Sequence, residues 1–150
     1  MKHALVLLAI SVALSGCATA TLGDKTTEAE LKKFTPIPGR VSVYVCRPNL
    51  FTGSAVGVEV IVNGTSIGSL KTNTFAHTSV APGKVAVFLR RKGIGPNSGD
   101  SGTLELQASS GDVRIVWAGQ AGLIGPVTVD SFNTLADAEA CVRAADYAVP

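Results

Sequence analysis

The 150-residue chain has little of several features that would assign it to a class of protein directly. Only 5% of its residues are aromatic, and 13 basic against 11 acidic residues leave a formal charge of +2. No dense basic cluster is present, so we expect no nucleic-acid partner. No apolar run reaches the roughly 18 residues of a spanning helix, which excludes a multi-pass membrane protein. With 46% hydrophobic residues the chain is too apolar for disorder, and its length predicts one domain.

The first residues have the layout of an export signal. Lys2 and His3 form a short basic start, and residues 4–14 are apolar except for Ser11. A run of this length suits the apolar region of a signal peptide and is too short to span a bilayer. We therefore predict a signal peptide over residues 1–16.

The tetrapeptide Leu14-Ser15-Gly16-Cys17 follows the apolar run. It resembles the bacterial lipobox, in which Leu, a small residue and Gly or Ala precede an invariant Cys. The resemblance implies cleavage before Cys17 and a diacylglycerol on the Cys17 thiol, so that the membrane is a partner through a lipid anchor. It also implies a lipid-anchored protein of the bacterial cell envelope. The alternative is an ordinary secretory signal followed by an unrelated cysteine.

Residues 17–39 are predicted to be the lipidated N-terminus and a flexible tether. Residues 28–34 could form one or two helical turns, but isolated helices this short are marginal. Pro36 and Pro38 then exclude helix. Ala18 is not the Asp that retains enterobacterial lipoproteins in the inner membrane, which favours the outer membrane, facing the periplasm, in a Gram-negative host.

From Arg40 the apolar pattern changes to the period of two that is typical of strands. Strand-like runs follow at intervals of about 8–12 residues. Asn63-Gly64 favours a type I′ hairpin turn, Pro82-Gly83 favours a type II turn, and residues 102–118 read as a further hairpin. These patterns predict a mainly β domain over residues 40–147, a seven- to eight-stranded antiparallel sandwich.

One C-terminal helix is predicted to pack on this sandwich or on one of its edges. Thr134 and Asp137 form a capping-box pattern at its start. Four apolar residues then fall on one face at helical spacing, namely Leu135, Ala138, Val142 and Ala145.

Three motifs between about residues 41 and 90 resemble a small domain of unknown function that is common in bacterial lipoproteins. They are Tyr44-Val45-Cys46-Arg47-Pro48, Val62-Asn63-Gly64 with Ile67-Gly68-Ser69-Leu70, and Ala81-Pro82-Gly83-Lys84. The family has an aromatic residue where this chain has Cys46, and His where it has Val85. The order of strands is also similar to that of prealbumin-like sandwiches. The resemblance implies a non-enzymatic accessory or binding domain.

Few residues are suited to catalysis. His77 is the one histidine that remains after the signal, and no Gly-x-Ser-x-Gly motif is present to position a nucleophile. His77, Cys46, Cys141 and the scattered carboxylates lack the spacing of metal ligands. We therefore expect no enzyme activity, no metal and no cofactor.

Three functions remain open. The first is a membrane-anchored, non-catalytic binding or accessory module whose partner is an envelope protein or polymer. The others are a purely structural envelope lipoprotein and a small hydrolase. An apolar surface patch or an unprotected edge strand would favour the binding module. A deep pocket holding His77 beside a carboxylate would favour the hydrolase.

Cys46 and Cys141 are a possible disulfide. The lipid would occupy the Cys17 thiol, so Cys46 and Cys141 are the two cysteines left to pair. The predicted compartment outside the cytoplasm is oxidising, which favours a disulfide. Cys46 lies on the strand face shared by Ser42 and Tyr44, and Cys141 lies at the margin of the helix's apolar face. A bridge needs Cα atoms within about 7 Å. The alternative is two buried free thiols.

Overall fold

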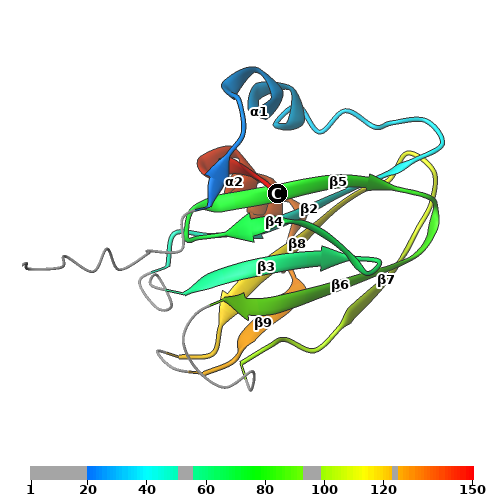
Figure 1. Cartoon of the computed structure of the whole chain (residues 1–150). Helices are drawn as coiled ribbons and strands as arrows, with labels where there is room; N and C mark the ends of the chain where they lie inside the picture. The colour runs from blue at the N-terminus through cyan, green and yellow to red at the C-terminus, as the bar shows by residue number, and fades with distance from the viewer. Residues whose placement is uncertain (1–19, 51–55, 93–98, 123–124) are drawn as a thin grey trace, which may run out of the picture.

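The computed structural model describes residues 20–50, 56–92, 99–122 and 125–150. The predicted signal peptide and Cys17 lie outside these residues. Within the described ranges the chain is mainly β, with ten strands in two sheets and two helices (Figure 1). The mainly β prediction is confirmed, whereas the structure has more strands and one more helix than the sequence predicts.

The larger sheet contains six strands in the spatial order β1 (Thr21–Leu22), β10 (Asp146–Val149), β5 (Thr74–Val80), β2 (Val41–Arg47), β8 (Val113–Gln120) and β9 (Val127–Ser131). The smaller sheet has the order β4 (Thr65–Leu70), β3 (Gly57–Val62), β6 (Gly83–Lys92) and β7 (Leu104–Ala108). The helices are α1 (Lys25–Leu31) and α2 (Leu135–Ala144).

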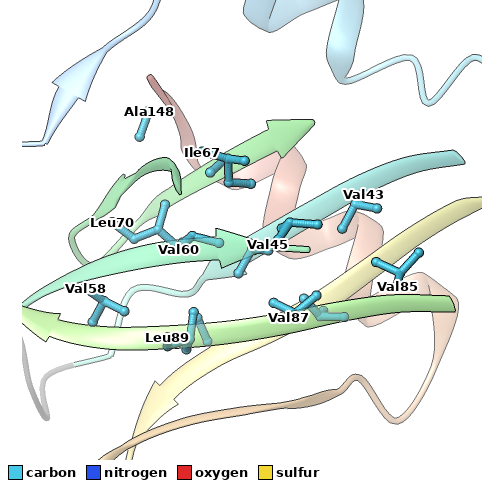
Figure 2. Close-up of a cluster of buried hydrophobic side chains, with 14 of the residues drawn as sticks. Val43, Val45, Val58, Val60, Ile67, Leu70, Val85, Val87, Leu89 and Ala148 are labelled. Atoms are coloured by element: carbon cyan, nitrogen blue, oxygen red, sulfur yellow. The ribbon is translucent and has the colours of Figure 1, made fainter. Parts of the chain in front are cut away.

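One buried aliphatic core draws side chains from both sheets. Val43 and Val45 of β2 belong to the same cluster as Val60 of β3 and Val87 and Leu89 of β6, and all five are fully buried (Figure 2). Each side chain of this kind contributes roughly 1.5–3 kcal/mol when it is fully buried. The period of two therefore correctly identifies the residues that face the other sheet.

The strand pairing is mixed, which corrects the antiparallel prediction. β2 is antiparallel to β5 but parallel to β8, and β10 is parallel to β5. The predicted hairpin over residues 102–118 does not form, because β7 pairs with β6 while β8 pairs with β2 and β9. Residues 109–112 thus cross from one sheet to the other. Gly111, with φ of 84°, suits a hairpin and a crossover equally, so turn chemistry could not distinguish them.

The hairpin between β3 and β4 agrees with the sequence. Asn63 and Gly64 have φ of 48° and 80°, the two positive values that a type I′ turn requires. The Asn63 side chain also accepts a hydrogen bond from the Ala86 amide at 2.8 Å, which attaches the turn to β6.

Where the structure describes the predicted tether, it is folded. β1 pairs antiparallel with β10, and α1 follows with Asp24 as its N-cap, accepting from the Thr27 amide at 2.8 Å. A Cβ at Gly23 would collide with the ring of Tyr147, so this glycine permits the close approach of the segment. Tertiary contacts hold α1, which could not be inferred from the propensity of so short a helix.

The second helix is α2, and it begins as predicted. Thr134 Oγ1 accepts from the Asp137 amide at 3.1 Å, which confirms the N-cap. Ala138 and Val142 are buried, but Leu135 is 66% exposed and does not belong to the buried face. The chain then continues into β10, so the predicted C-terminal helix is followed by a strand that lies between β1 and β5 in the larger sheet.

Candidate functional site

The outer face of the six-stranded sheet lies away from the four-stranded sheet. Ser42, Tyr44 and Cys46 of β2 lie on this face, and all seven residues of β2 are buried. The strand is therefore covered on both sides, rather than half-buried as its alternating pattern predicts. A second buried cluster, distinct from the core between the sheets, joins Tyr44 and Cys46 to residues of α2 and of the segment after α1.

A disulfide attaches α2 to this face. Cys46 and Cys141 are bonded, and their Cα atoms lie 6.3 Å apart, within the distance that the bridge requires. The bond joins the second strand of the chain to its last helix, 95 positions away.

The carboxylate of Glu28 holds α1 in position. It accepts from Lys32 Nζ at 2.8 Å, from Lys25 Nζ at 2.9 Å and from the Tyr147 amide at 3.1 Å. Burial alone would raise the pKa of Glu28, but these three hydrogen bonds outweigh it and lower the pKa to about 2. The carboxylate therefore stays ionised and connects α1 to β10.

The segment after α1 is held by aromatic contacts. Phe34 adopts a left-handed backbone with φ of 53°, and its buried ring packs edge-on against Tyr44 with centroids 5.4 Å apart. The Tyr44 hydroxyl donates to the Leu31 carbonyl at 2.9 Å, and burial raises the pKa of Tyr44 to about 12. Arg143 of α2 donates to the Lys32 carbonyl at 3.1 Å and lies over the Phe34 ring. Both ends of the chain thus meet above β2.

A cavity of about 410 Å³ lies between α1, the segment after it and the sheet. Ser42, Tyr44 and His77 line it from the sheet, and Leu31 and Ile37 line it from the N-terminal segment. The cavity walls therefore come largely from the residues that the sequence predicts to be a tether. We refer to it as the α1 cavity.

His77 of β5 lines the α1 cavity beside Tyr44. It stands opposite Tyr44 in the β2–β5 pairing, with ring centroids 4.6 Å apart. Its Nε2 atom is buried and has no hydrogen-bond partner among the described residues. Burial lowers the pKa of His77 to about 4, because desolvation disfavours the charged imidazolium. His77 is consequently neutral at pH 7.

Glu30 also lines the α1 cavity, so a carboxylate and His77 share one site, as the hydrolase alternative requires. The Glu30 carboxylate is 66% exposed, however, and accepts from Lys33 Nζ at 2.6 Å. His77 Nε2 is bonded neither to Glu30 nor to the hydroxyl of Ser42, which also lines the cavity. A base with a pKa of about 4 is also poorly matched to proton abstraction at neutral pH. The described residues therefore do not form a hydrogen-bonded histidine–carboxylate pair at this site.

Two further hollows occur among the described residues. One, of about 270 Å³, lies between β7, β8 and α2 and is lined by Arg114 and the exposed Leu135. The other, of about 390 Å³, lies on the outer face of the four-stranded sheet beside Phe88 and the Glu59–Arg90 ion pair.

The sequence predicted Cys46 and Cys141 as a possible disulfide, but it assigned His77 to no site and missed α1 as the wall of a cavity. A signal for this helix was present in the sequence, because Glu28 and Lys32 have the i, i+4 spacing of a helical ion pair.

No cluster of three or more His, Cys, Asp or Glu side chains in the described ranges could hold a metal ion. No helix in the same ranges is long and apolar enough to cross a bilayer. No protein-family model, curated protein or solved structure matches this chain.

Proposed function

We propose that this protein is a membrane-anchored lipoprotein of the bacterial cell envelope, and that its domain is a non-catalytic binding module. The proposed fold is a prealbumin-like sandwich, supported by two sheets that share one core. Support for the anchor is the apolar run followed by Leu14-Ser15-Gly16-Cys17. Ala18 favours delivery to the outer membrane, with the domain facing the periplasm.

The folded N-terminal segment shortens the proposed tether considerably. Only residues 18–20 separate Cys17 from β1, which begins at Thr21. Four extended steps from Cys17 to Thr21 span at most roughly 14 Å. A lipid on Cys17 would therefore hold β1 and α1 close to the bilayer surface.

The α1 cavity is the observation that carries the binding function. Its volume of about 410 Å³ lies in the range of roughly 300–1,000 Å³ that is typical of ligand sites. The cavity combines apolar side chains with a desolvated, neutral imidazole, as recognition sites commonly do. A hydrolase would need a stronger base than His77.

Native mass spectrometry of the protein released gently from its own envelope fraction tests binding. Thr35→Trp fills the mouth of the α1 cavity, and Thr65→Trp makes the same change at an exposed position of β4. We expect a bound small molecule on the wild type and on Thr65→Trp, and its loss from Thr35→Trp. Identical spectra without an adduct for all three proteins would support the structural lipoprotein instead.

The anchor is tested separately. Cys17→Ser should abolish incorporation of radiolabelled palmitate and release the protein from membranes. Unchanged partition of this variant into the membrane fraction would contradict the lipoprotein proposal without affecting the binding test.

A further inference from the structure

We propose that two copies of this chain associate through β7, whose outer edges pair antiparallel about Leu106 and join the two four-stranded sheets into one. The inference goes beyond the proposed ligand binding and does not depend on it. It follows from the lack of protection at this edge, from the direction of its backbone groups and from the order of its side chains.

The described sheets have four edge strands, β1, β4, β7 and β9, and three of them are protected against further pairing. β1 has only two residues, and the pairing of β4 with β3 is interrupted by a shift of register. On β9 the Val127 amide donates to the Gly99 carbonyl at 2.7 Å, and the Ser131 amide donates to the Asp130 carboxylate at 2.7 Å. β7 differs, because it has five residues, no proline or lysine, and continuous pairing with β6.

The outer edge of β7 carries unpaired backbone groups. Ala86 of β6 exchanges two hydrogen bonds with Asn63 in the β3–β4 turn, so its backbone groups point away from β7. Glu105 stands opposite Ala86, and the two residues of such a pair both point away from each other. Gln107, two residues on, points outward as well, and its carbonyl accepts from Arg114 Nη2 at 3.2 Å. Among the described residues, the other outward groups of these two residues have no partner.

The order of side chains on β7 suits antiparallel pairing with a second copy, and that order is Leu104-Glu105-Leu106-Gln107-Ala108. With the two-fold axis at Leu106, Glu105 stands opposite Gln107 of the second copy and exchanges both backbone hydrogen bonds with it. The carboxylate of Glu105 thus meets an amide rather than a like charge. Leu104 stands opposite Ala108 of the second copy, so a large side chain meets a small one.

A hollow of about 270 Å³ beside this edge receives the side chains of the added strand. Leu106 lines this hollow together with Phe132 and Leu135. Opposite side chains of a strand pair lie on the same face, so Leu106 of the second copy enters the hollow. Leu135, which is 66% exposed although its spacing places it on the apolar face of α2, is covered there. An apolar strand of this chain therefore fits both the backbone and the hollow.

Cysteine cross-linking of the full chain in intact cells tests the pairing and its register. Leu106 faces itself across the axis with Cα atoms about 4.5 Å apart, within reach of a disulfide. The two copies of Glu105 are diagonal neighbours about 7–8 Å apart, at the limit of that reach. Mild oxidation should link Leu106→Cys into a dimer and give at least fivefold less dimer with Glu105→Cys, the matched control. Cys46 and Cys141 are already bonded and do not compete.

A proline at position 105 tests the outward amide of β7. Because β6 does not use this amide, Glu105→Pro should leave the fold intact, as proline does on edge strands. In the Leu106→Cys background, Glu105→Pro should lower the yield of dimer at least tenfold, since each copy loses a hydrogen bond. Glu105→Thr keeps the amide and should retain the dimer.

Sedimentation of the wild-type chain in mild detergent should show a monomer–dimer equilibrium, and this measurement does not depend on the folding of any variant. Three results would overturn the pairing of β7 with itself. They are a wild type that stays monomeric at every concentration, equal yields of dimer from Leu106→Cys and Glu105→Cys, and cross-links of Leu106→Cys to other proteins alone. None of these results bears on ligand binding in the α1 cavity.

Discussion

The two faces of the six-stranded sheet are built by different means. The inner face packs mainly aliphatic side chains against the other sheet, and at the end of β2 it also buries Arg47, which donates to the Val56 carbonyl at 2.6 Å. The outer face is covered by α1 and α2, which come from opposite ends of the described chain (Figure 1). It carries the disulfide, the buried carboxylate of Glu28 and the unpaired nitrogen of His77.

The difference is between a close-packed core and a face that retains a cavity. The inner face gains most of its stability from the non-directional burial of close-packed aliphatic side chains. The outer face is held by a few directional contacts between remote segments, and these leave the α1 cavity beside His77. The following variants test whether the two faces depend on these different interactions.

The largest expected effect is on the outer face, from removing its covalent bond. Cys46→Ala with Cys141→Ala should lower the free energy of unfolding by roughly 4–5 kcal/mol, since the bond closes a loop of 95 positions. Urea unfolding of the oxidised domain and of the double variant measures the difference. A thiol assay on the denatured, unreduced protein should find neither cysteine free. Two free thiols, or equal stability, would mean that packing alone holds α2.

The inner face should respond next most strongly. Leu89 is fully buried in the core between the sheets, so Leu89→Ala should cost about 2–5 kcal/mol from lost burial and the cavity left behind. Leu135→Ala is the matched control, because this leucine is 66% exposed and should change stability by less than about 0.5 kcal/mol. Equal costs in urea unfolding would contradict the assignment of the inner face as the main core.

His77 should make the outer face sensitive to mild acid. The pKa of His77 is lowered from 6.5 to about 4 by burial, so the unfolded chain binds a proton that the folded chain excludes between these values. Stability should therefore fall by about 2–3 kcal/mol as the pH drops from 7 to 4.5. The groups facing His77 are Tyr44, which stays protonated, and Glu30, which is exposed and paired with Lys33.

His77→Phe is the control for this acid effect. Urea unfolding of the variant at pH 7 and pH 4.5 should show most of the loss removed. A loss of equal size in wild type and variant would assign the acid sensitivity to other groups. Glu28 contributes little to this difference, because its pKa is lowered from 4.5 to about 2, so most of its contribution is lost below pH 4.5, and the loss is the same in wild type and variant.

The smallest effect should come from the contact that docks α1. Glu28→Gln removes the charge that binds Lys32 and the Tyr147 amide, and should cost about 1–2 kcal/mol. Glu30→Gln, on the same helix, removes an exposed pair and should cost less than about 0.5 kcal/mol. Unfolding curves that coincide for the two variants would mean that Glu28 does not hold α1.

The sequence is informative about the inner face and much less so about the outer one. Alternating valines identify β2, and Asn63-Gly64 identifies the β3–β4 turn, because both signals are local. The parallel pairing of β2 with β8 depends on a crossover whose turn residues also suit a hairpin. No residue near the crossover at 109–112 indicates which sheet the following strand joins. The prediction of a hairpin over residues 102–118 was therefore wrong.

The α1 cavity could not be predicted for a related reason. Residues 20–39 have the composition of a linker, and their structure comes from contacts with β10 and α2 that are distant in sequence. His77 could be recognised as a candidate because it is the one histidine after the signal. Its burial and lowered pKa depend on the α1 segment lying over it, which periodicity does not report.

Hydrogen exchange of the segment before β2 tests the central claim most directly, because the cavity exists only if α1 docks on the sheet. In the wild-type domain the amides of Gly23, which donates to Tyr147, and of Lys32, which donates to Glu28, should exchange far more slowly than in an unfolded chain. Glu28→Gln should accelerate both amides and leave the amides of β2 protected. Exchange of residues 23–32 at the unfolded rate in the wild type would contradict the account, because the outer face would then have neither a wall nor a cavity.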